Sequence, residues 1–159
     1  ALFFWLRPQA VAAPEMVAED QQIDGIIIEK AKREMSLFRQ GQLIKSYNIR
    51  LGFAPEGHKT REGDGKTPEG DYLINRRNPR SKFHLSLGLD YPLPAQQANA
   101  KANGINPGGD IFIHGQPNWM AKLPALTHDW TDGCVALTNQ EIEEIWRLVP
   151  IGTKVSIRP

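Results

Sequence analysis

The stretch DWTDGCVALTNQEIEEIWRLVP, residues 129–150, sets the only cysteine of the chain directly before a helix with a clear start and end. Thr138 and Glu141 have the spacing of a capping box, and Pro150 stops the pattern. The apolar residues that follow the cap recur at the i, i+3, i+4 and i+7 positions of one helix face: Ile142, Ile145, Trp146 and Val149. The pattern predicts an amphipathic helix whose Trp146 packs in the core.

Short β-branched and aromatic runs before this helix are typical of strands. Residues 23–28, 35–38 and 43–49 form three such runs, and Gln40-Gly41 between the last two predicts a hairpin. A glycine-rich loop follows at residues 52–70, which breaks any regular element.

The second half of the chain repeats this alternation of strands and loops. Two further strands are expected at residues 71–74 and 83–87, with a turn at Asn78-Pro79 between them, and residues 92–109 read as another loop. Residues 111–113 predict a short strand buried on both faces, and residues 152–157 a closing strand. The sequence therefore predicts a mainly β domain with one main helix after Cys134.

The composition is that of one ordinary globular domain. The 159 residues are 40% hydrophobic and 23% charged, and 19 basic against 18 acidic residues leave a net charge of +1. This balance gives no basis for a nucleic-acid interface or an electrostatic membrane-binding surface, so a small or neutral-to-zwitterionic partner is favoured. With one cysteine, no intrachain disulfide can form, and any thiol chemistry falls to Cys134.

The N-terminal residues 1–21 are set apart from the domain at residues 22–159. Residues 1–6, ALFFWL, form an apolar run too short to span a bilayer, and residues 10–13, AVAA, have the small-residue spacing of a signal-peptidase site. Residues 1–21 could be the remainder of a signal peptide or a membrane anchor, or an element that packs on the domain, and the sequence leaves these alternatives open.

Cys134 and His114 are the candidates for catalysis. A thiol is activated by a nearby base, and His114 ends an apolar strand with Gly115 after it to offer a carbonyl that orients the ring. The interval between them, residues 116–133, could fold back as a lid. A buried small hydrophobe is the other interpretation of Cys134. A zinc site is disfavoured because the cysteine and the four histidines, which also include His58, His84 and His128, lack ligand spacing.

Three motifs, in order, are similar to one family. His114-Gly115 followed by TDGCV at residues 131–135 resembles the HG…[S/T]xGC signature of the L,D-transpeptidase (YkuD-type) catalytic domain. GDGKTPEG at residues 63–70 and VPIGT at residues 149–153 agree with it. The resemblance covers roughly residues 22 to 158. It implies a mixed β-sheet sandwich or barrel of the L,D-transpeptidase type, exported to the periplasm or cell envelope.

The resemblance also implies the chemistry. Cys134 corresponds to the nucleophile, His114 to the general base and Gly115 to the residue whose carbonyl orients that base, while Gly133 and the Cys134 N–H fall at the oxyanion hole. The implied substrates are peptidoglycan stem tetrapeptides, cleaved through a Cys thioester, with an outer-membrane lipoprotein as another implied acceptor or substrate. The resemblance implies neither a metal nor an organic cofactor.

Two departures leave the outcome of the thioester open. Many members carry His at Asp132, and many carry Arg or Asn at Ala136; the YafK-like branch reads DWTDGC with Ala, as this chain does. A transpeptidase, an L,D-carboxypeptidase or amidase, and an inactive peptidoglycan-binding module all fit. The substrate-binding candidates are Trp130, Thr131, Asp132, Trp119 and Lys66. Lys59 and Arg61, like Lys66, lie in the glycine-rich loop, where solvated charge is the expected role of each.

Overall fold

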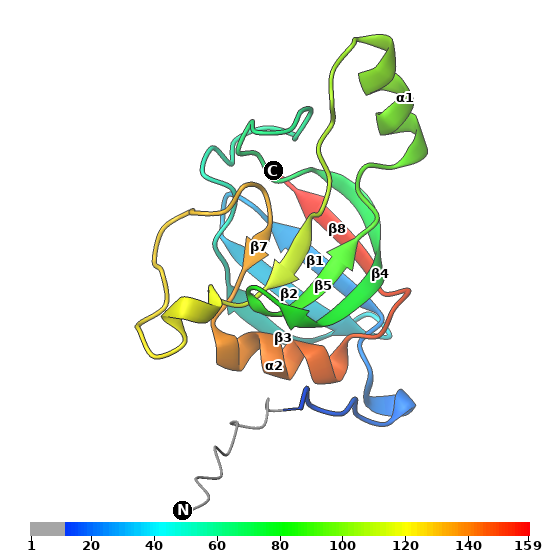
Figure 1. Cartoon of the computed structure of the whole chain (residues 1–159). Helices are drawn as coiled ribbons and strands as arrows, with labels where there is room; N and C mark the ends of the chain where they lie inside the picture. The colour runs from blue at the N-terminus through cyan, green and yellow to red at the C-terminus, as the bar shows by residue number, and fades with distance from the viewer. Residues whose placement is uncertain (1–11) are drawn as a thin grey trace, which may run out of the picture.

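The computed structural model describes residues 12–159, and its eight strands form one sheet in the order β3-β2-β1-β8-β4-β5-β6-β7 (Figure 1). The strands are β1 Gly25–Glu29, β2 Glu34–Arg39, β3 Gln42–Asn48, β4 Gly70–Ser81, β5 His84–Leu89, β6 Phe112–His114, β7 Val135–Ala136 and β8 Lys154–Arg158. The α-helices are α1 Pro94–Ala102 and α2 Asn139–Leu148, and two 3₁₀ turns span Glu19–Gln21 and Asn118–Met120.

The sheet is mixed, with mostly antiparallel pairs and two parallel pairs, β1 with β8 and β6 with β7. The first three strands form an antiparallel meander, whose hairpin uses Gln40 at φ 48° and Gly41 at φ 76°. β8 then lies parallel to β1 and antiparallel to β4, and β7 lies parallel to β6. Beyond β3, Arg50 and Ala136 exchange backbone hydrogen bonds of 3.0 and 2.8 Å, so the sheet curls until its two ends meet. The predicted mainly β mixed sheet with a main helix after Cys134 is confirmed.

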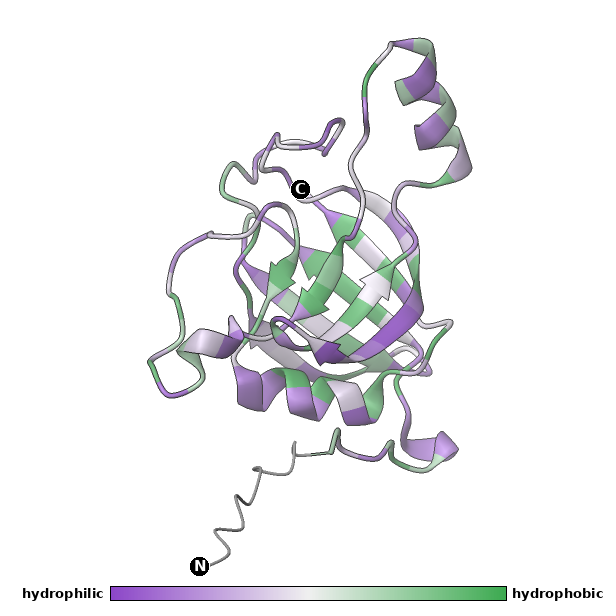
Figure 2. Ribbon diagram, in the orientation of Figure 1, coloured by the Kyte–Doolittle hydropathy of each residue, from purple (hydrophilic) through white to green (hydrophobic). Residues whose placement is uncertain are grey.

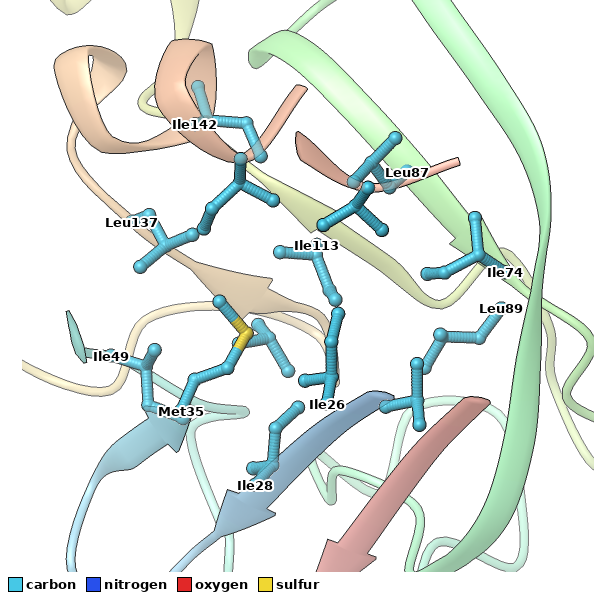
Figure 3. Packing of buried hydrophobic residues seen from close by; sticks show 14 of the residues in the cluster. Ile26, Ile28, Met35, Ile49, Ile74, Leu87, Leu89, Ile113, Leu137 and Ile142 are labelled. Carbon is cyan, nitrogen blue, oxygen red and sulfur yellow. The ribbon is translucent and has the colours of Figure 1, made fainter. Parts of the chain in front are cut away.

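The core fills the inside of this curled sheet and the space under α2. Alternate residues of the strands point inward, as Ile26 and Ile28 of β1 do, because side chains along a strand alternate between its two faces (Figure 3). Figure 2 shows hydrophobic residues interleaved with more polar ones along the strands, and both hydrophobic and hydrophilic residues along α2. Each fully buried isoleucine or leucine contributes about 1.5–3 kcal/mol.

Helix α2 has the predicted cap and the predicted buried face. The Glu141 N–H donates to Thr138 Oγ1 at 3.2 Å, and the Thr138 N–H donates to Glu141 Oε1 at 3.0 Å. Its buried residues, Ile142, Ile145 and Trp146, pack toward the sheet, which confirms the core position of Trp146. At the other end, the Arg77 guanidinium lies 3.9 Å from the centre of the Trp146 ring and donates to the Trp146 carbonyl at 2.9 Å.

Two local predictions are wrong. The chain does not turn at Asn78-Pro79, because β4 runs through both residues to Ser81, and the reversal comes at residues 82–83. An edge position free of ladder bonds tolerates proline, and the ladder between β4 and β5 is irregular between Asn78 and Ser81. The expected loop at residues 92–109 contains α1, whose Gln96 side chain accepts the Leu93 N–H at 2.7 Å and so caps the helix start. This helix projects away from the sheet at the end opposite α2 (Figure 1).

The described part of the N-terminal segment lies along α2. The Val17 and Ile23 N–H groups donate to the Arg147 and Leu148 carbonyls at 2.9 and 2.8 Å. The apolar run ALFFWL at residues 1–6 and the start of AVAA at residues 10 and 11 lie outside the described residues. Within residues 12–159, no helix is both long and apolar enough to cross a membrane.

Candidate active site

The parallel pairing of β6 with β7 places Cys134 beside His114. Ile113 pairs with Val135, so Cys134 precedes β7 opposite Phe112 and lies one diagonal step from His114. Phe112 and His114 share a face of β6 because strand side chains alternate, while Ile113 points into the core. Phe112, His114 and Cys134 all line one cleft of about 690 Å³. Phe112 is half-buried at this cleft, so the prediction that residues 111–113 are buried on both faces is wrong.

The imidazole of His114 is held as a proton acceptor. Its residue is only 1% exposed, and Nδ1 lies 2.7 Å from the carbonyl oxygen of Gly115. A carbonyl only accepts hydrogen bonds, so Nδ1 carries the proton and Nε2 has a free lone pair. Burial lowers the pKa of His114 to about 4, against the pull of the Gly115 carbonyl, which favours the protonated ring. The ring is therefore neutral at pH 7.

The thiol of Cys134 is also neutral at pH 7. Burial is the largest cause that raises its pKa to about 11, and the carboxylates of Asp132 and Asp110 raise it further. The Phe112 N–H, which donates to Sγ at 3.4 Å, and the charge of Lys59 oppose this shift. The thiol itself donates to the Asp110 carbonyl at 3.4 Å. Because the resting pair is uncharged, the thiol proton must move to a base as the sulfur attacks.

The turn before Cys134 leaves one backbone donor free. The Thr131 hydroxyl donates to the Cys134 carbonyl at 2.7 Å and accepts the Gly133 N–H at 3.1 Å, so this hydroxyl and the Gly133 donor are used inside the turn. Gly133 has φ 138°, and a Cβ there would lie 2.8 Å from the Lys66 carbonyl oxygen. No acceptor within residues 12–159 takes the Cys134 N–H. Of the two expected oxyanion-hole donors, the Cys134 N–H is thus the one available.

Asp129, the first carboxylate of DWTDGC, has a structural role, because its oxygens are bound by Arg33 and Leu51. The Arg33 guanidinium donates to it through Nε at 3.1 Å and Nη2 at 2.8 Å, and the Leu51 N–H donates to it at 2.9 Å. This fork joins the end of the β1–β2 turn to the loop that carries the cysteine. Asp132, by contrast, is exposed and lines the cleft.

Lys59 in the glycine-rich loop is a buried ion-pair partner rather than a solvated charge, which corrects the expectation for this residue. Its side chain is 3% exposed, and Nζ lies 2.9 Å from Asp64 Oδ1. The Asp64 carboxylate also accepts the N–H groups of Thr60, Arg61 and Lys66 at 2.9–3.1 Å. Burial raises the pKa of Asp64, but these hydrogen bonds and Lys59 together lower it to about 2. Lys59, Glu62 and Gly63 of this loop form one wall of the cleft.

The predicted substrate-binding residues are divided by the structure. Trp130, Thr131 and Asp132 line the cleft, whereas its lining within the described chain includes neither Trp119 nor Lys66. Trp119 is 79% exposed on the 3₁₀ turn Asn118–Met120. Residues 116–133 are predicted to form a lid, but the first of them to line the cleft is Trp130. The part that contains the prolines therefore does not cover the cleft.

Two aromatic rings enclose the imidazole, and sequence reasoning missed one of them. Phe83 stacks on His114 with centroids 4.3 Å apart at an interplanar angle of 16°, and Trp130 lies 5.6 Å away at 52°. An aromatic residue inside a predicted strand carries no local signal for this role. Among buried side-chain nitrogen and oxygen atoms of residues 12–159, Trp130 Nε1 is the one without a hydrogen-bond partner.

Residues suited to a metal are not gathered at this site. Within residues 12–159, no group of three or more His, Cys, Asp or Glu side chains lies close enough together to hold a metal ion. His84 pairs with Glu143 at 2.7 Å, and His58 accepts the Glu69 N–H at 2.8 Å.

A neutral thiol and a neutral imidazole whose Nδ1 is held by a carbonyl, both lining one cleft of a mainly β domain, are the groups that a cysteine acyltransferase or hydrolase uses. A model of the YkuD family, the L,D-transpeptidase catalytic domain, matches residues 23–157. The chain therefore belongs to the L,D-transpeptidase catalytic domain family.

Known proteins place the chain within this family. YafK of Escherichia coli (strain K12), which bears an L,D-transpeptidase name, is 32% identical over 130 residues, covering 78% of this chain and 46% of YafK. YqjB of Bacillus subtilis (strain 168), similarly named, is 26% identical over 137 residues, covering 83% of this chain and 69% of YqjB. The YafK match supports the YafK-like branch. The chain spans about half the length of YafK.

Solved structures share the fold. The helical cell shape determining protein Pgp2 of Campylobacter jejuni superposes with a TM-score of 0.65 at 24% identity, over 93% of this chain and 51% of Pgp2. An L,D-transpeptidase of Xylanimonas cellulosilytica superposes with a TM-score of 0.56 at 16% identity, over 88% of this chain and 62% of that chain. At these identities the likeness concerns the fold alone.

Proposed function

We propose that the chain is a cysteine-dependent L,D-transpeptidase that acts on peptidoglycan stem tetrapeptides in the cell envelope. The observation that carries this proposal is the neutral thiol–imidazole pair, in which the Gly115 carbonyl fixes the His114 tautomer at 2.7 Å. Membership in the L,D-transpeptidase family supplies the substrate class. Acceptors could include a second stem peptide, a free D-amino acid or a lipoprotein amine.

The first half-reaction forms the thioester. Cys134 Sγ attacks the amide carbonyl at the L-centre of the diamino acid residue while its proton passes to His114 Nε2. The carbonyl oxygen gains negative charge, and the free Cys134 N–H is the donor at hand for it. The tetrahedral intermediate then breaks its C–N bond, and the terminal D-residue leaves as an amine with the proton from His114.

The second half-reaction resolves the thioester. The acceptor amine attacks the same carbonyl, His114 takes its proton, and the C–S bond breaks to regenerate the thiol. If water attacks in place of the amine, the same residues perform an L,D-carboxypeptidase or amidase reaction. The carboxylates of Asp132 and Asp110 in the cleft favour binding of a cationic amine, which gives up one proton to solvent before its neutral form attacks.

The experiment incubates the protein with purified tetrapeptide muropeptides, with and without an added D-amino acid, and weighs the products by mass spectrometry. Exchanged or cross-linked products support the transferase. Tripeptide as the sole product would replace it by the hydrolase, and unchanged substrate with retained wall binding would replace it by a binding module.

Two variants test the nucleophile in the same assay. Cys134→Ala removes the attacking sulfur, so all products should disappear. Trp119→Ala is the matched control, because this side chain is 79% exposed and lies outside the cleft lining, and it should keep wild-type turnover. Products from Cys134→Ala at the wild-type rate would contradict the assignment.

A further inference from the structure

Phe83 lies at the tip of the β4–β5 hairpin, far in sequence from the residues assigned to the reaction. Its ring covers one face of the His114 imidazole, with centroids 4.3 Å apart and an interplanar angle of 16°. It also lines the cleft that holds Cys134. The contact is a nearly parallel stack, which is a defined orientation rather than an accidental touch of two buried groups.

The hairpin tip is fastened to the strand end that carries the histidine. The Gly115 N–H donates to the Phe83 carbonyl at 2.9 Å, and the Phe83 N–H donates to Ser81 Oγ at 2.9 Å. Asn118 ties the flanks of the tip: its side chain accepts the His84 N–H at 2.9 Å and donates to the Ser81 carbonyl at 2.9 Å. These bonds fix Phe83 relative to His114–Gly115 from both sides of the turn.

The backbone of the tip indicates that its geometry is imposed by these contacts. His84 has φ 71°, in the left-handed region that non-glycine residues seldom adopt. The same residue is held by a 2.7 Å contact between its ring and Glu143 of α2. A strained position persists where its surroundings determine it, and such positions gather at functional sites.

A stacked aromatic ring affects the two protonation states of an imidazole differently. The neutral ring gains ordinary packing, whereas the imidazolium is also attracted by the negative face of the benzene ring. His114 becomes charged only when it takes the thiol proton, so this attraction grows as the reaction proceeds. Burial opposes that charge. Within the described residues, no carboxylate hydrogen-bonded to the His114 ring offsets this cost.

We propose that Phe83 is a positioning residue, whose ring fixes the plane of the His114 imidazole and stabilises the imidazolium formed as Cys134 loses its proton. For peptide turnover this inference rests on the proposed function, but proton transfer from the thiol takes place in any reaction of the sulfur with an electrophile. Trp130, tilted at 52° to the imidazole, offers a weaker version of the same contact.

Charged and titratable groups around the pair must be held constant in the test. Those that line the same cleft come from three loops and are Lys59, Glu62, Asp110 and Asp132, together with Cys134 itself. On the packed side, α2 contributes Glu143, which pairs with His84. None of these is altered by a change at Phe83.

The test measures alkylation of Cys134 by iodoacetamide across pH, with no peptide substrate. In this reaction the S–C bond forms, iodide leaves, and the thiol proton passes to His114. Phe83→Leu keeps an apolar side chain but removes the aromatic face, so we expect the rate at pH 7 to fall roughly threefold to thirtyfold. Phe83→Tyr keeps the face and should retain the wild-type rate.

The pH profile separates this role from a loosened pocket. Loss of the aromatic face lowers the pKa of His114 further, so the acid limb of the Phe83→Leu profile should move to lower pH. Entry of water into a loosened pocket would raise this pKa toward its usual value and move the limb to higher pH, which would overturn the inference. An unchanged rate and profile in Phe83→Leu would overturn it as well.

Folding and function are controlled separately. If Phe83→Leu does not fold, Phe83→Met replaces it, and a large loss of rate in a folded Phe83→Tyr variant would in any case contradict the inference. Wild-type protein that alkylates as expected but leaves muropeptides unchanged would overturn the proposed function, while the alkylation results would still support the role of Phe83.

Discussion

His114, the proposed base, and Gly115, whose carbonyl accepts the hydrogen bond of its ring, are adjacent in the chain. The packing around Gly115 leaves no room for a side chain. A Cβ at this position would lie 2.5 Å from Asn139 Oδ1 and 3.0 Å from the Phe83 carbonyl oxygen. Both atoms are themselves hydrogen-bonded, to the Gln116 N–H at 2.8 Å and to the Gly115 N–H at 2.9 Å. The glycine therefore allows the strand end to pack tightly enough to hold the imidazole.

The pKa values at the site predict how activity depends on pH. His114 acts as a base when it is neutral, so wild-type activity should fall as the pH drops through about 4, the pKa to which burial lowers this group. In His114→Gln no base remains, and the rate should follow the thiolate fraction, rising roughly tenfold per pH unit below the thiol pKa of about 11. Alkylation rates between pH 6 and 10 measure this slope. A profile of His114→Gln that is as flat as wild type would remove His114 as the base.

Asp129 and Asp132 both lie near the thiol, and the sequence alone does not distinguish which of them has a structural role. Both precede Cys134 within five residues, and their roles depend on Arg33, which is 96 residues from Asp129. The catalytic pair itself could be proposed because the motifs are local. The role of Phe83 depends on a contact between segments far apart in sequence, which no local pattern encodes. The Lys59–Asp64 pair lies within one loop, but its burial depends on how that loop packs against the rest of the chain.

At the level of elements, the loop that carries Cys134 is anchored from the opposite end of the sheet. Leu51 donates to Asp129 at 2.9 Å and accepts the Thr131 N–H at 3.2 Å, next to the pairing of Arg50 with Ala136. Arg33 completes the anchor through its fork to Asp129. The position of the thiol is thus set by the segment after β3 as much as by β7.

This anchor can be tested with Asp129→Asn. The change removes the charge from a fork whose two side chains are 34% and 20% exposed, so the loss of stability should be modest, about 1–2 kcal/mol in the free energy of unfolding. Urea unfolding measures it. The control is Asp132→Asn, an exposed carboxylate of the same loop without a hydrogen bond among the described residues, and equal effects of the two changes would contradict the anchor.

The elements themselves were predictable where the pattern is local. Helix α2 has its cap and its apolar face in one stretch, and most strands are continuous β-branched runs. Helix α1 has one buried residue, Ala100, so it lacks the apolar periodicity by which a helix is recognised. β4 continues through Asn78-Pro79 because β5 pairs with it beyond that point, which is a tertiary effect.

For the whole molecule, burial of a neutral histidine makes stability depend on pH. The pKa of His114 is lowered to about 4 in the folded chain, from 6.5 when unfolded, so the unfolded state binds a proton first as the pH falls. The contribution of the neutral His114 ring to the free energy of unfolding is complete above about pH 6.5. It is lost progressively between about pH 6.5 and 4, by about 3 kcal/mol.

Urea unfolding of wild type and His114→Gln at pH 7.5 and 4.5 measures how much His114 contributes to the pH dependence of stability. Both proteins also lose stability at low pH as carboxylates such as Asp64 become protonated. Because the pKa of Asp64 is lowered to about 2, its part of this loss occurs below about pH 4. The wild type should therefore lose more stability than the variant over this interval. The same loss in both proteins would mean that His114 is not the titrating group.

Among the strands of residues 12–159, β8 comes last in the chain, yet it alone pairs with both β1 and β4. On a ribosome, the meander β1–β3 and the group β4–β7 emerge earlier, and before β8 is made their backbones pair through Arg50 with Ala136 and Gly52 with Thr131. The thiol loop draws its anchors from residues 33, 50 and 51 of the first group and its imidazole from the second. The sheet between β1 and β4 is therefore completed only when residues 154–158 have been made, after every residue of the proposed site.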